Sequence, residues 1–162
     1  MNRLFASRRA GLRRRDLLIA ALAIGAVGGL RAAPALPPVE VWKDPSCGCC
    51  GDWVQHLRAH GFGVTVHETG ELPARRAQLG MPATLASCHS AAIAGYAIEG
   101  HVPAREIRRL LAERPRAVGL SVPGMKVGSP GMDGPAYGGR VQPYDVLLVG
   151  ADGRTTVYAS YR

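Results

Sequence analysis

The chain has 162 residues and a formal net charge of +8, which by itself would favour a nucleic-acid-binding protein. Most of that charge lies in residues 1–35, which contain seven arginines and one acidic residue, and the remainder has 13 Lys and Arg against 11 Asp and Glu. A net charge of +2 on the remainder excludes a strongly basic domain, so we expect no nucleic-acid partner. About 127 residues are enough for one domain with a modest core.

The N-terminal segment has the pattern of an export signal. Arg14 and Arg15 precede an uncharged apolar run, residues 17–30, which is shorter than the about 20 residues that a membrane-spanning helix needs. The paired arginines favour a twin-arginine signal, and residues 33–35 (Ala-Pro-Ala) form a small-residue cleavage site. We therefore expect residues 1–35 to be a signal peptide, with a retained N-terminal anchor as the alternative.

The first half of the exported domain predicts alternating strands and short helices. Residues 39–42 and 64–67 alternate apolar and polar side chains and are expected to be strands. Residues 52–60 and 72–79 have helical apolar spacing, and a glycine follows each of them.

The next segments predict a hairpin and a longer helix. The apolar runs 91–94 and 96–98 flank Gly95 and can pair as two strands. Pro103 starts an amphipathic helix, which Pro115 ends.

The C-terminal part is expected to contain a long loop and a second hairpin. Residues 119–139 are rich in glycine and proline and have little periodicity, so we expect them to form one loop. The loop carries Met125 and Met132, each within a Pro-Gly-Met unit. Asp152-Gly153 lies between two apolar runs and is a strong signal for a hairpin turn.

The order of these elements is that of a thioredoxin-like domain. Residues 80–84 (Gly-Met-Pro-Ala-Thr) also resemble the segment that carries the cis proline of thioredoxins. The expected fold class is therefore α/β, a thioredoxin-like domain with a mixed sheet, a Gly/Pro/Met-rich loop and a C-terminal β-hairpin. Another α/β sandwich with the same order of elements is the alternative.

Three of the four cysteines, Cys47, Cys49 and Cys50, are crowded into four residues. A secreted scaffold spreads its cysteines to close long loops, so this crowding indicates metal binding or thiol redox chemistry. The start of a helix lowers thiol pKa values, which serves both chemistries equally. Cys47 and Cys50 form the Cys-x-x-Cys pair of thiol–disulfide exchange proteins, but that interpretation leaves Cys49 unexplained.

The remaining cysteine, Cys88, is followed by His89, and this pair can supply the second half of a metal site. Three thiolates as close as those of residues 47–50 can share several soft ions more readily than they can surround one. Among the available metals, thiolate sulfur selects Cu(I). A structural zinc site or an iron–sulfur cluster is the less favoured alternative.

Histidine and methionine side chains offer further ligands. His89 is the first candidate among the histidines, and His101, just ahead of a helix, is the second. The thioethers of Met125 and Met132 are soft donors suited to Cu(I), although packing of the loop onto the domain also accounts for them. The other histidines are expected to be solvated surface positions: His56, His60 and His67.

Several segments together resemble a known family, the periplasmic copper-resistance proteins of the CopG type. The resemblance runs from about residue 39 to residue 158, with no departure at the cysteine and Cys-His positions. It is carried by residues 44–53 (Asp-Pro-Ser-Cys-Gly-Cys-Cys-Gly-Asp-Trp), 85–90 (Leu-Ala-Ser-Cys-His-Ser), 96–103, 118–125 and 128–132.

The resemblance implies a periplasmic copper-handling role and assigns ligands. Residues 36–162 would be a thioredoxin-like metal-binding domain with more than one Cu(I) ion, copper redox activity, and copper chaperones or efflux components as partners. After signal cleavage no membrane association is expected. A periplasmic thiol–disulfide oxidoreductase that uses Cys47 and Cys50 is the competing enzyme hypothesis. The ligands implied by the resemblance are Cys47, Cys49, Cys50 and Cys88, completed by His89, Met125 and Met132.

Overall fold

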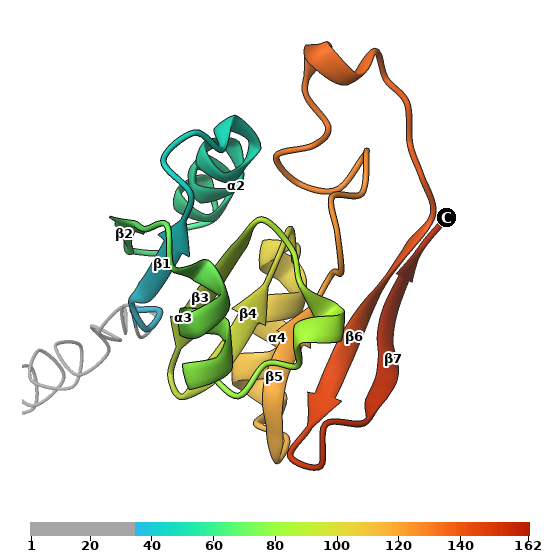
Figure 1. Cartoon of the computed structure of the whole chain (residues 1–162). Coiled ribbons are helices and arrows are strands. Elements are labelled where there is room, and N and C mark those ends of the chain that lie inside the picture. The colour runs from blue at the N-terminus through green and yellow to red at the C-terminus, as the bar shows by residue number, and fades with distance from the viewer. Residues whose placement is uncertain (1–34) are drawn as a thin grey trace, which may run out of the picture. The chain divides into compact units, whose positions relative to one another are not determined.

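The computed structural model describes residues 35–162, so nearly all of the expected signal peptide lies outside the described residues. In this part of the chain, helices and strands alternate around one seven-stranded sheet (Figure 1). None of the helices described here is long and apolar enough to cross a membrane.

The sheet is mixed and has the strand order β2-β1-β3-β4-β5-β6-β7. The pairs β1/β2 and β4/β5 are parallel, and all other neighbours are antiparallel. The strands are β1 (Val39–Lys43), β2 (Val64–Glu68), β3 (His89–Ile93), β4 (Tyr96–Glu99), β5 (Ala117–Ser121), β6 (Tyr144–Gly150) and β7 (Thr155–Tyr161). The helices are α2 (Gly48–Ala59), α3 (Leu72–Gln78) and α4 (Ala104–Glu113), with the 3₁₀ turns η1 (Ala83–Leu85) and η2 (Pro135–Tyr137).

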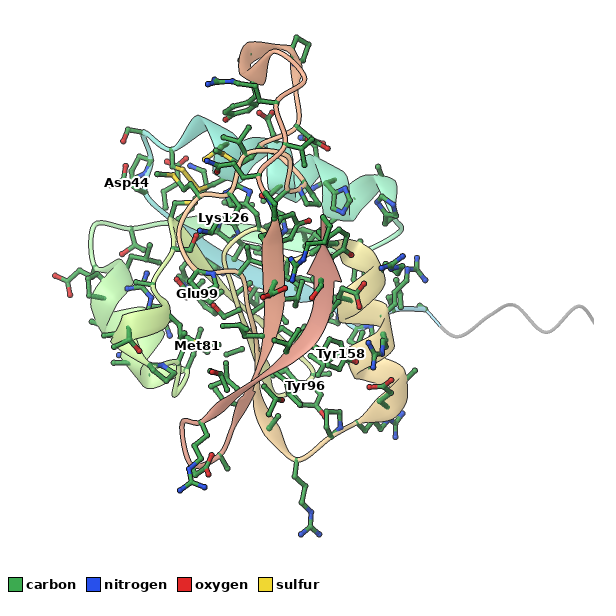
Figure 2. The ribbon with its side chains drawn as sticks, turned by 90° about the vertical axis from the view of Figure 1, so that its right-hand side faces the viewer. Asp44, Met81, Tyr96, Glu99, Lys126 and Tyr158 are labelled. Carbon is green, nitrogen blue, oxygen red and sulfur yellow. A yellow bond between two sulfur atoms is a disulfide. The ribbon has the colours of Figure 1, made fainter. Side chains whose placement is uncertain are left out.

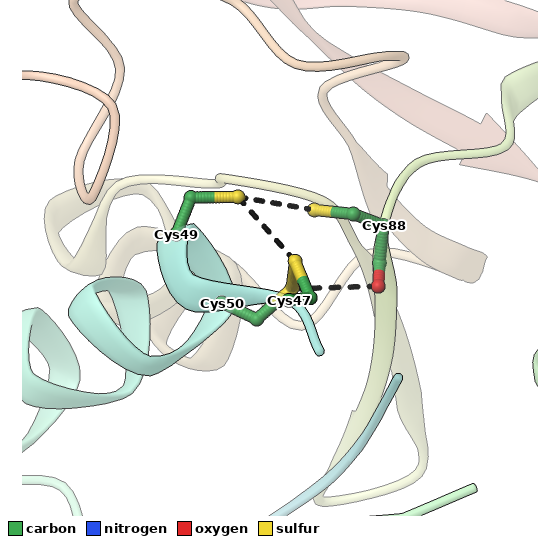
Figure 3. Close-up of side chains that lie close together, drawn as sticks. All are labelled: Cys47, Cys49, Cys50 and Cys88. Carbon is green, nitrogen blue, oxygen red and sulfur yellow. Dashed lines mark hydrogen bonds between the residues drawn. A yellow bond between two sulfur atoms is a disulfide. The ribbon is translucent and has the colours of Figure 1, made fainter. Parts of the chain in front are cut away.

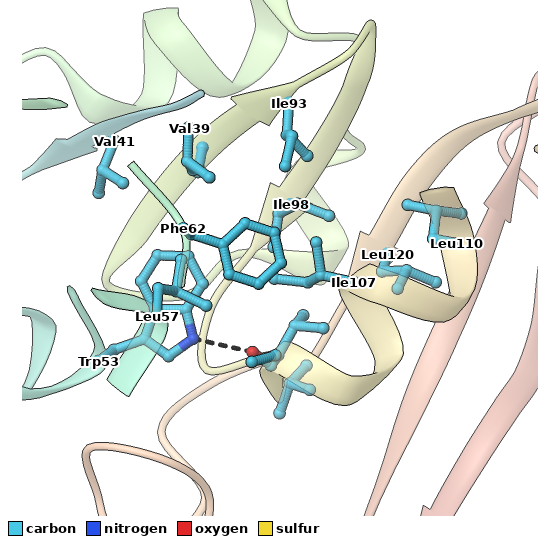
Figure 4. Close-up of a cluster of buried hydrophobic side chains, with 14 of the residues drawn as sticks. Val39, Val41, Trp53, Leu57, Phe62, Ile93, Ile98, Ile107, Leu110 and Leu120 are labelled. Carbon is cyan, nitrogen blue, oxygen red and sulfur yellow. Dashed lines mark hydrogen bonds between the residues drawn. The ribbon is translucent and has the colours of Figure 1, made fainter. Parts of the chain in front are cut away.

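The main core lies between the sheet and the helices α2 and α4 (Figure 4). Side chains on a strand alternate between the two faces, so Ile98 of β4 joins this core while Ala97 faces the other side of the sheet. On that other side a smaller cluster forms next to α3, from Ala97, Met81 and Val149. Trp53 fixes α2 in place, because its indole ring is buried and donates a hydrogen bond to the Val102 carbonyl (2.9 Å).

The structure confirms an α/β fold with a mixed sheet and a C-terminal hairpin. The strands β3 and β4 pair as the hairpin expected around Gly95, and Asp152-Gly153 forms the turn between β6 and β7. All peptide bonds in residues 35–162 are trans, so Pro82 lacks the cis geometry of the thioredoxin segment to which it was compared. The thioredoxin-like class itself stays a prediction.

The start of the predicted loop 119–139 is wrong. Residues 119–121 belong to β5, which pairs with β4 in the interior of the sheet. Gly119 is glycine because a Cβ atom there would come within 1.7 Å of the Ala97 carbonyl oxygen. In the sequence alone, a glycine that lets two strands approach closely looks the same as a glycine in a loop. The helix α2 also begins at Gly48, four residues earlier than expected, and includes Cys49 and Cys50.

Candidate metal centre

The first half of the centre is the N-terminal turn of α2. A tight turn precedes it, in which the Asp44 side chain accepts a hydrogen bond from the Ser46 N–H (2.8 Å). Cys47 then occupies the N-cap position, and Cys49 and Cys50 lie in the first helical turn. The free N–H groups and the dipole of a helix N-terminus stabilise negative charge, so this position favours thiolates.

The second half comes from the sheet. The strand β3 pairs antiparallel with β1, and Lys43, the last residue of β1, lies opposite His89, the first residue of β3. Cys88, which directly precedes β3, therefore lies beside the C-terminal end of β1, where the chain leaves the sheet and runs into α2. Its Sγ atom is 4.0 Å from Sγ of Cys49, and its carbonyl oxygen is 3.4 Å from Sγ of Cys50 (Figure 3).

The four sulfur atoms form one cluster. Sγ of Cys47 is 3.4 Å from Sγ of Cys49, and Cys47 and Cys50 are joined by a disulfide with their Cα atoms 5.6 Å apart. All four Sγ atoms lie within 4.8 Å of one another. Cys50 is fully buried, whereas the other three cysteines are half-buried. The sheet and the helix thus bring together the cysteines that the sequence separates by 38 residues.

Two buried imidazoles extend the cluster on the Cys88 side. Nε2 of His101 lies 3.1 Å from Sγ of Cys88, and Nδ1 of His89 lies 3.5 Å from the same sulfur. The side-chain donor atoms of Cys88, His89 and His101 all lie within 4.8 Å of one another. His101 was only the second candidate from the sequence, so the structure places it closer to the centre than its sequence context indicated.

The His101 ring has the arrangement of a metal-binding histidine. Its Nδ1–H donates to the Pro130 carbonyl (2.8 Å), which leaves the lone pair of Nε2 directed at Cys88. Ligating histidines commonly donate their second ring N–H to a carbonyl in this way. Burial, as the largest cause, lowers the pKa of His101, so the imidazole is neutral and able to bind a metal.

His89, like His101, is fully buried. Its ring packs 4.2 Å from the Trp53 ring, and burial followed by the neighbouring His101 lowers its pKa well below the usual value. Its Nε2 atom is buried and has no hydrogen-bond partner. An unpaired buried polar atom is costly, so His89 is not an ordinary core histidine with all its hydrogen bonds made. The ring atom that faces the sulfurs is its Nδ1, 3.5 Å from Sγ of Cys88.

The thiol of Cys88 is held in its protonated form. Burial and, second, the neighbouring Cys49 raise the pKa of Cys88 to about 12. A cation bound at the sulfurs would offset both causes of this rise, since it would compensate the negative charge of the thiolates. Cys88 would therefore bind a metal ion as a thiolate only with release of its proton.

The two methionines of the loop differ in position. Met132 is 7% exposed, and its Sδ atom accepts a hydrogen bond from the Tyr137 hydroxyl (3.2 Å). The neighbouring Gly131 lies against the first turn of α2, where a Cβ atom would come within 2.9 Å of the Cys49 carbonyl oxygen. Met125 is 56% exposed and lies at the surface. Around residues 130–132 the loop therefore packs against the start of α2, which carries Cys49.

The other histidines also differ from one another. His60 and His67 are exposed, as the sequence indicated. His56 is half-buried, and its Nε2 atom accepts a hydrogen bond from the backbone N–H of Ala104 (3.1 Å). His56 thus satisfies the first turn of α4 instead of lying free in solvent.

The fold and the site together define an α/β protein with two adjoining groups of candidate metal ligands, four cysteine sulfurs and a Cys-His-His group, which share Cys88. Two solved structures of the copper resistance protein CopG are similar to the chain. Form 1 is 44% identical with a TM-score of 0.72, and the match covers 78% of this chain and 98% of that one. Form 2 is 43% identical with a TM-score of 0.73, and the match covers 78% and 99%.

The chain belongs to the CopG family of copper resistance proteins. Residues 85–132 match a family described as "Protein of unknown function, DUF411". No curated protein matches the chain. The resemblance inferred from the cysteine, Cys-His and Pro-Gly-Met segments is therefore confirmed at the level of the family.

Proposed function

We propose that this chain is an exported copper-binding protein that holds Cu(I) through Cys47, Cys49, Cys50 and Cys88. The observation that carries the proposal is that the four sulfur atoms lie within 4.8 Å of one another. The names of the two similar structures, copper resistance proteins, support copper as the metal. Thiolates are soft ligands and prefer Cu(I) to harder ions.

The geometry of the sulfurs suits bridging ions. A metal–thiolate bond of about 2.3 Å lets one ion join two sulfurs up to roughly 4.6 Å apart. The separation of 4.0 Å between Cys49 and Cys88 falls within that limit. With the imidazoles of His89 and His101 beside Cys88, the donors outnumber the four that one tetrahedral ion takes. This surplus of donors supports more than one copper ion per chain.

The disulfide connects copper binding to redox state. Cys47 and Cys50 offer thiolates only after their disulfide takes up two electrons. The reduced protein therefore presents four thiols and the oxidised protein two, Cys49 and Cys88. A redox role on copper, in which the centre interconverts Cu(I) and Cu(II), belongs to the same proposal.

The proposed site of action is the periplasm. The twin arginines and the apolar run of residues 1–35 support export, and residues 36–162 would then be the mature thioredoxin-like domain. Its partners would be copper ions and the copper chaperones or efflux components that deliver or remove them. We propose no nucleic-acid partner, because the mature domain carries a net charge of only +2.

The disulfide also favours a second candidate, a thiol–disulfide oxidoreductase. Cys47 is half-buried and Cys50 fully buried, so a substrate thiolate reaches Cys47 first. Its attack on Cys47 breaks the Cys47–Cys50 bond and expels the Cys50 thiolate. A second substrate thiol then displaces Cys47, which leaves an oxidised substrate and a reduced protein. This candidate predicts insulin reduction or refolding activity without metal, lost in Cys50→Ser.

Anaerobic titration of the reduced protein with Cu(I), against a coloured competing chelator, tests the proposal. We expect more than one tightly held copper per chain, and fewer in Cys88→Ser. Met132→Leu should weaken binding, whereas the matched control Met81→Leu, a buried methionine in the core beside α3 (labelled in Figure 2), should not. If Cys88→Ser binds as much Cu(I) as the parent, the shared four-sulfur site is wrong. Metal analysis that finds zinc or iron instead would overturn copper as the metal.

A further inference from the structure

A buried ion pair lies on the side of the sheet that carries α3. Arg76 of α3 is 7% exposed and Glu99, the last residue of β4, is fully buried. Nε of Arg76 donates to Oε1 of Glu99 at 2.9 Å (Glu99 is labelled in Figure 2). Removing both charges from water is costly, and a hydrophobic pair of similar size often stabilises a fold as well. The pair therefore calls for an explanation beyond stability.

The pair holds both backbone polar groups of one residue, Ser87. Oε1 of Glu99 accepts a hydrogen bond from the Ser87 N–H (2.7 Å), and Nη2 of Arg76 donates to the Ser87 carbonyl (2.9 Å). The second carboxylate oxygen, Oε2, is occupied by the Ser90 hydroxyl (2.5 Å). Besides Arg76, the carboxylate thus accepts hydrogen bonds from Ser87 and Ser90, the residues on either side of the Cys88-His89 pair.

The sheet does not hold this segment by itself. Pairing of β3 with β1 begins at His89, and pairing of β3 with β4 begins at Ser90. Ser87 lies outside the ladder, between η1 and β3, and its backbone groups are held by side chains instead. The Ser87 hydroxyl donates to the Gly124 carbonyl (2.5 Å), which ties the start of the loop to the same point.

The position of Ser87 matters because the next residue is Cys88. The other three cysteines belong to the start of α2, so the separation between the two halves of the cluster depends on how the Cys88 segment is held. We propose that Arg76 and Glu99 are positioning residues, which act through the backbone of Ser87 to hold Cys88 Sγ within bonding reach of Cys49. The consequence for copper rests on the proposed function, but the positioning itself is measurable without metal.

The test uses disulfide formation between Cys49 and Cys88 as the measure of position. In a Cys47→Ser/Cys50→Ser background, metal-free protein is equilibrated with reduced and oxidised glutathione. Oxidised glutathione gives the Cys49–Cys88 disulfide and two reduced glutathione molecules, so two electrons leave the protein. The equilibrium ratio reports the effective concentration of one thiol at the other. When Glu99→Gln or Arg76→Met is added to this background, each should lower this effective concentration about tenfold or more. A tenfold change corresponds to about 30 mV in the reduction potential.

The chain supplies a matched control in a second buried carboxylate. Glu106 of α4 is 1% exposed, pairs with Arg105 (2.8 Å) and accepts a hydrogen bond from the Tyr161 hydroxyl (2.9 Å). Its partners belong to α4 and β7 and not to the Cys88 segment. Glu106→Gln should therefore lower Tm and leave the glutathione equilibrium unchanged.

Two further variants separate position from stability. Glu99→Gln with Arg76→Met removes both charges, so part of the Tm should return. The effective concentration should stay low, because the Ser87 carbonyl has lost its donor and the Ser87 N–H its charged acceptor. Arg76→Lys is a milder change, in which one ammonium replaces the fork that reaches both Glu99 and Ser87, and it should give an intermediate ratio.

Parental glutathione ratios in Glu99→Gln, Arg76→Met and Arg76→Lys, together with a lowered Tm, would overturn the positioning role and leave a purely structural ion pair. No copper is present in this measurement. A failure of the copper proposal would therefore leave the glutathione ratios, and the conclusion drawn from them, unchanged.

Discussion

Nε2 of His101 lies 3.1 Å from Sγ of Cys88, although the two residues are 13 positions apart in the chain. The β3–β4 hairpin produces this contact. Ser90 pairs with Glu99 at the end of the ladder, and counting outward in the same register places Cys88 opposite His101. Because Nδ1 of His101 donates to a carbonyl, its Nε2 lone pair is available to a metal ion held by Cys88.

Replacing His101 should therefore weaken copper binding. We expect His101→Gln to lower Cu(I) affinity by at least the about 10–100-fold that is typical for loss of an outer-shell partner of a metal site. His60→Gln is the control, since His60 is exposed near the far end of α2. Competition with a coloured chelator measures both affinities. Equal affinity in the two variants would remove His101 from the centre.

Copper binding should release a proton from Cys88. Because burial raises the pKa of Cys88 to about 12, this group is a thiol at neutral pH and must lose its proton to bind as thiolate. Binding at this sulfur therefore strengthens as pH rises, up to the pKa of the metal-free thiol. Calorimetry in two buffers of different ionisation enthalpy counts the protons released, and Cys88→Ser should release fewer per chain. An unchanged count would mean that Cys88 is not a ligand.

Reduction should change both the thiol count and the copper capacity. The metal-free oxidised protein has free thiols at Cys49 and Cys88, so denatured chains should react with two equivalents of a thiol reagent. After treatment with a dithiol reductant the Cys47–Cys50 bond opens, and four equivalents should react. The Cu(I) capacity should rise in parallel. Equal capacity in both redox states would show that Cys47 and Cys50 are not needed for copper.

Local sequence patterns predicted much of the fold. The alternating strands, the hairpin around Gly95 and the Asp152-Gly153 turn each depend on neighbouring residues, and all three are present. The strand β5 was not predicted, because its glycine, Gly119, has a tertiary cause. It permits the backbone of β5 to approach the Ala97 carbonyl, which no local pattern reveals.

Some residues of the candidate site could likewise be predicted from local sequence, and others could not. Cys47, Cys49 and Cys50 are crowded in the sequence itself, so their proximity needed no tertiary information. His101 needed the register of a hairpin to be extended two residues beyond its ladder, and the Arg76–Glu99 pair needed the packing of α3 on the sheet. Long-range placement of polar side chains depends on these tertiary relations, so a single sequence identifies the ligand types better than their neighbours.

Gly131 should be needed to keep the loop against α2. It has a φ of +83°, and a Cβ atom there would come within 2.6 Å of the Trp53 backbone nitrogen. Gly138 has a φ of +61° with open space around it, so Gly138→Ala carries only the left-handed backbone cost of about 1–2 kcal/mol. Gly131→Ala should cost more, since the first turn of α2 cannot move aside without moving Cys49.

Denaturant unfolding and alkylation rates of the oxidised protein measure the two effects. We expect Gly131→Ala to lower stability beyond Gly138→Ala and to speed alkylation of Cys49, because the displaced loop uncovers the cluster. Gly138→Ala should leave the alkylation rate at the parental value. If both variants alkylate at the parental rate, the loop does not shield the cysteines. Met132 then loses its support as a ligand, since that support is the packing of the neighbouring Gly131 against the turn that carries Cys49.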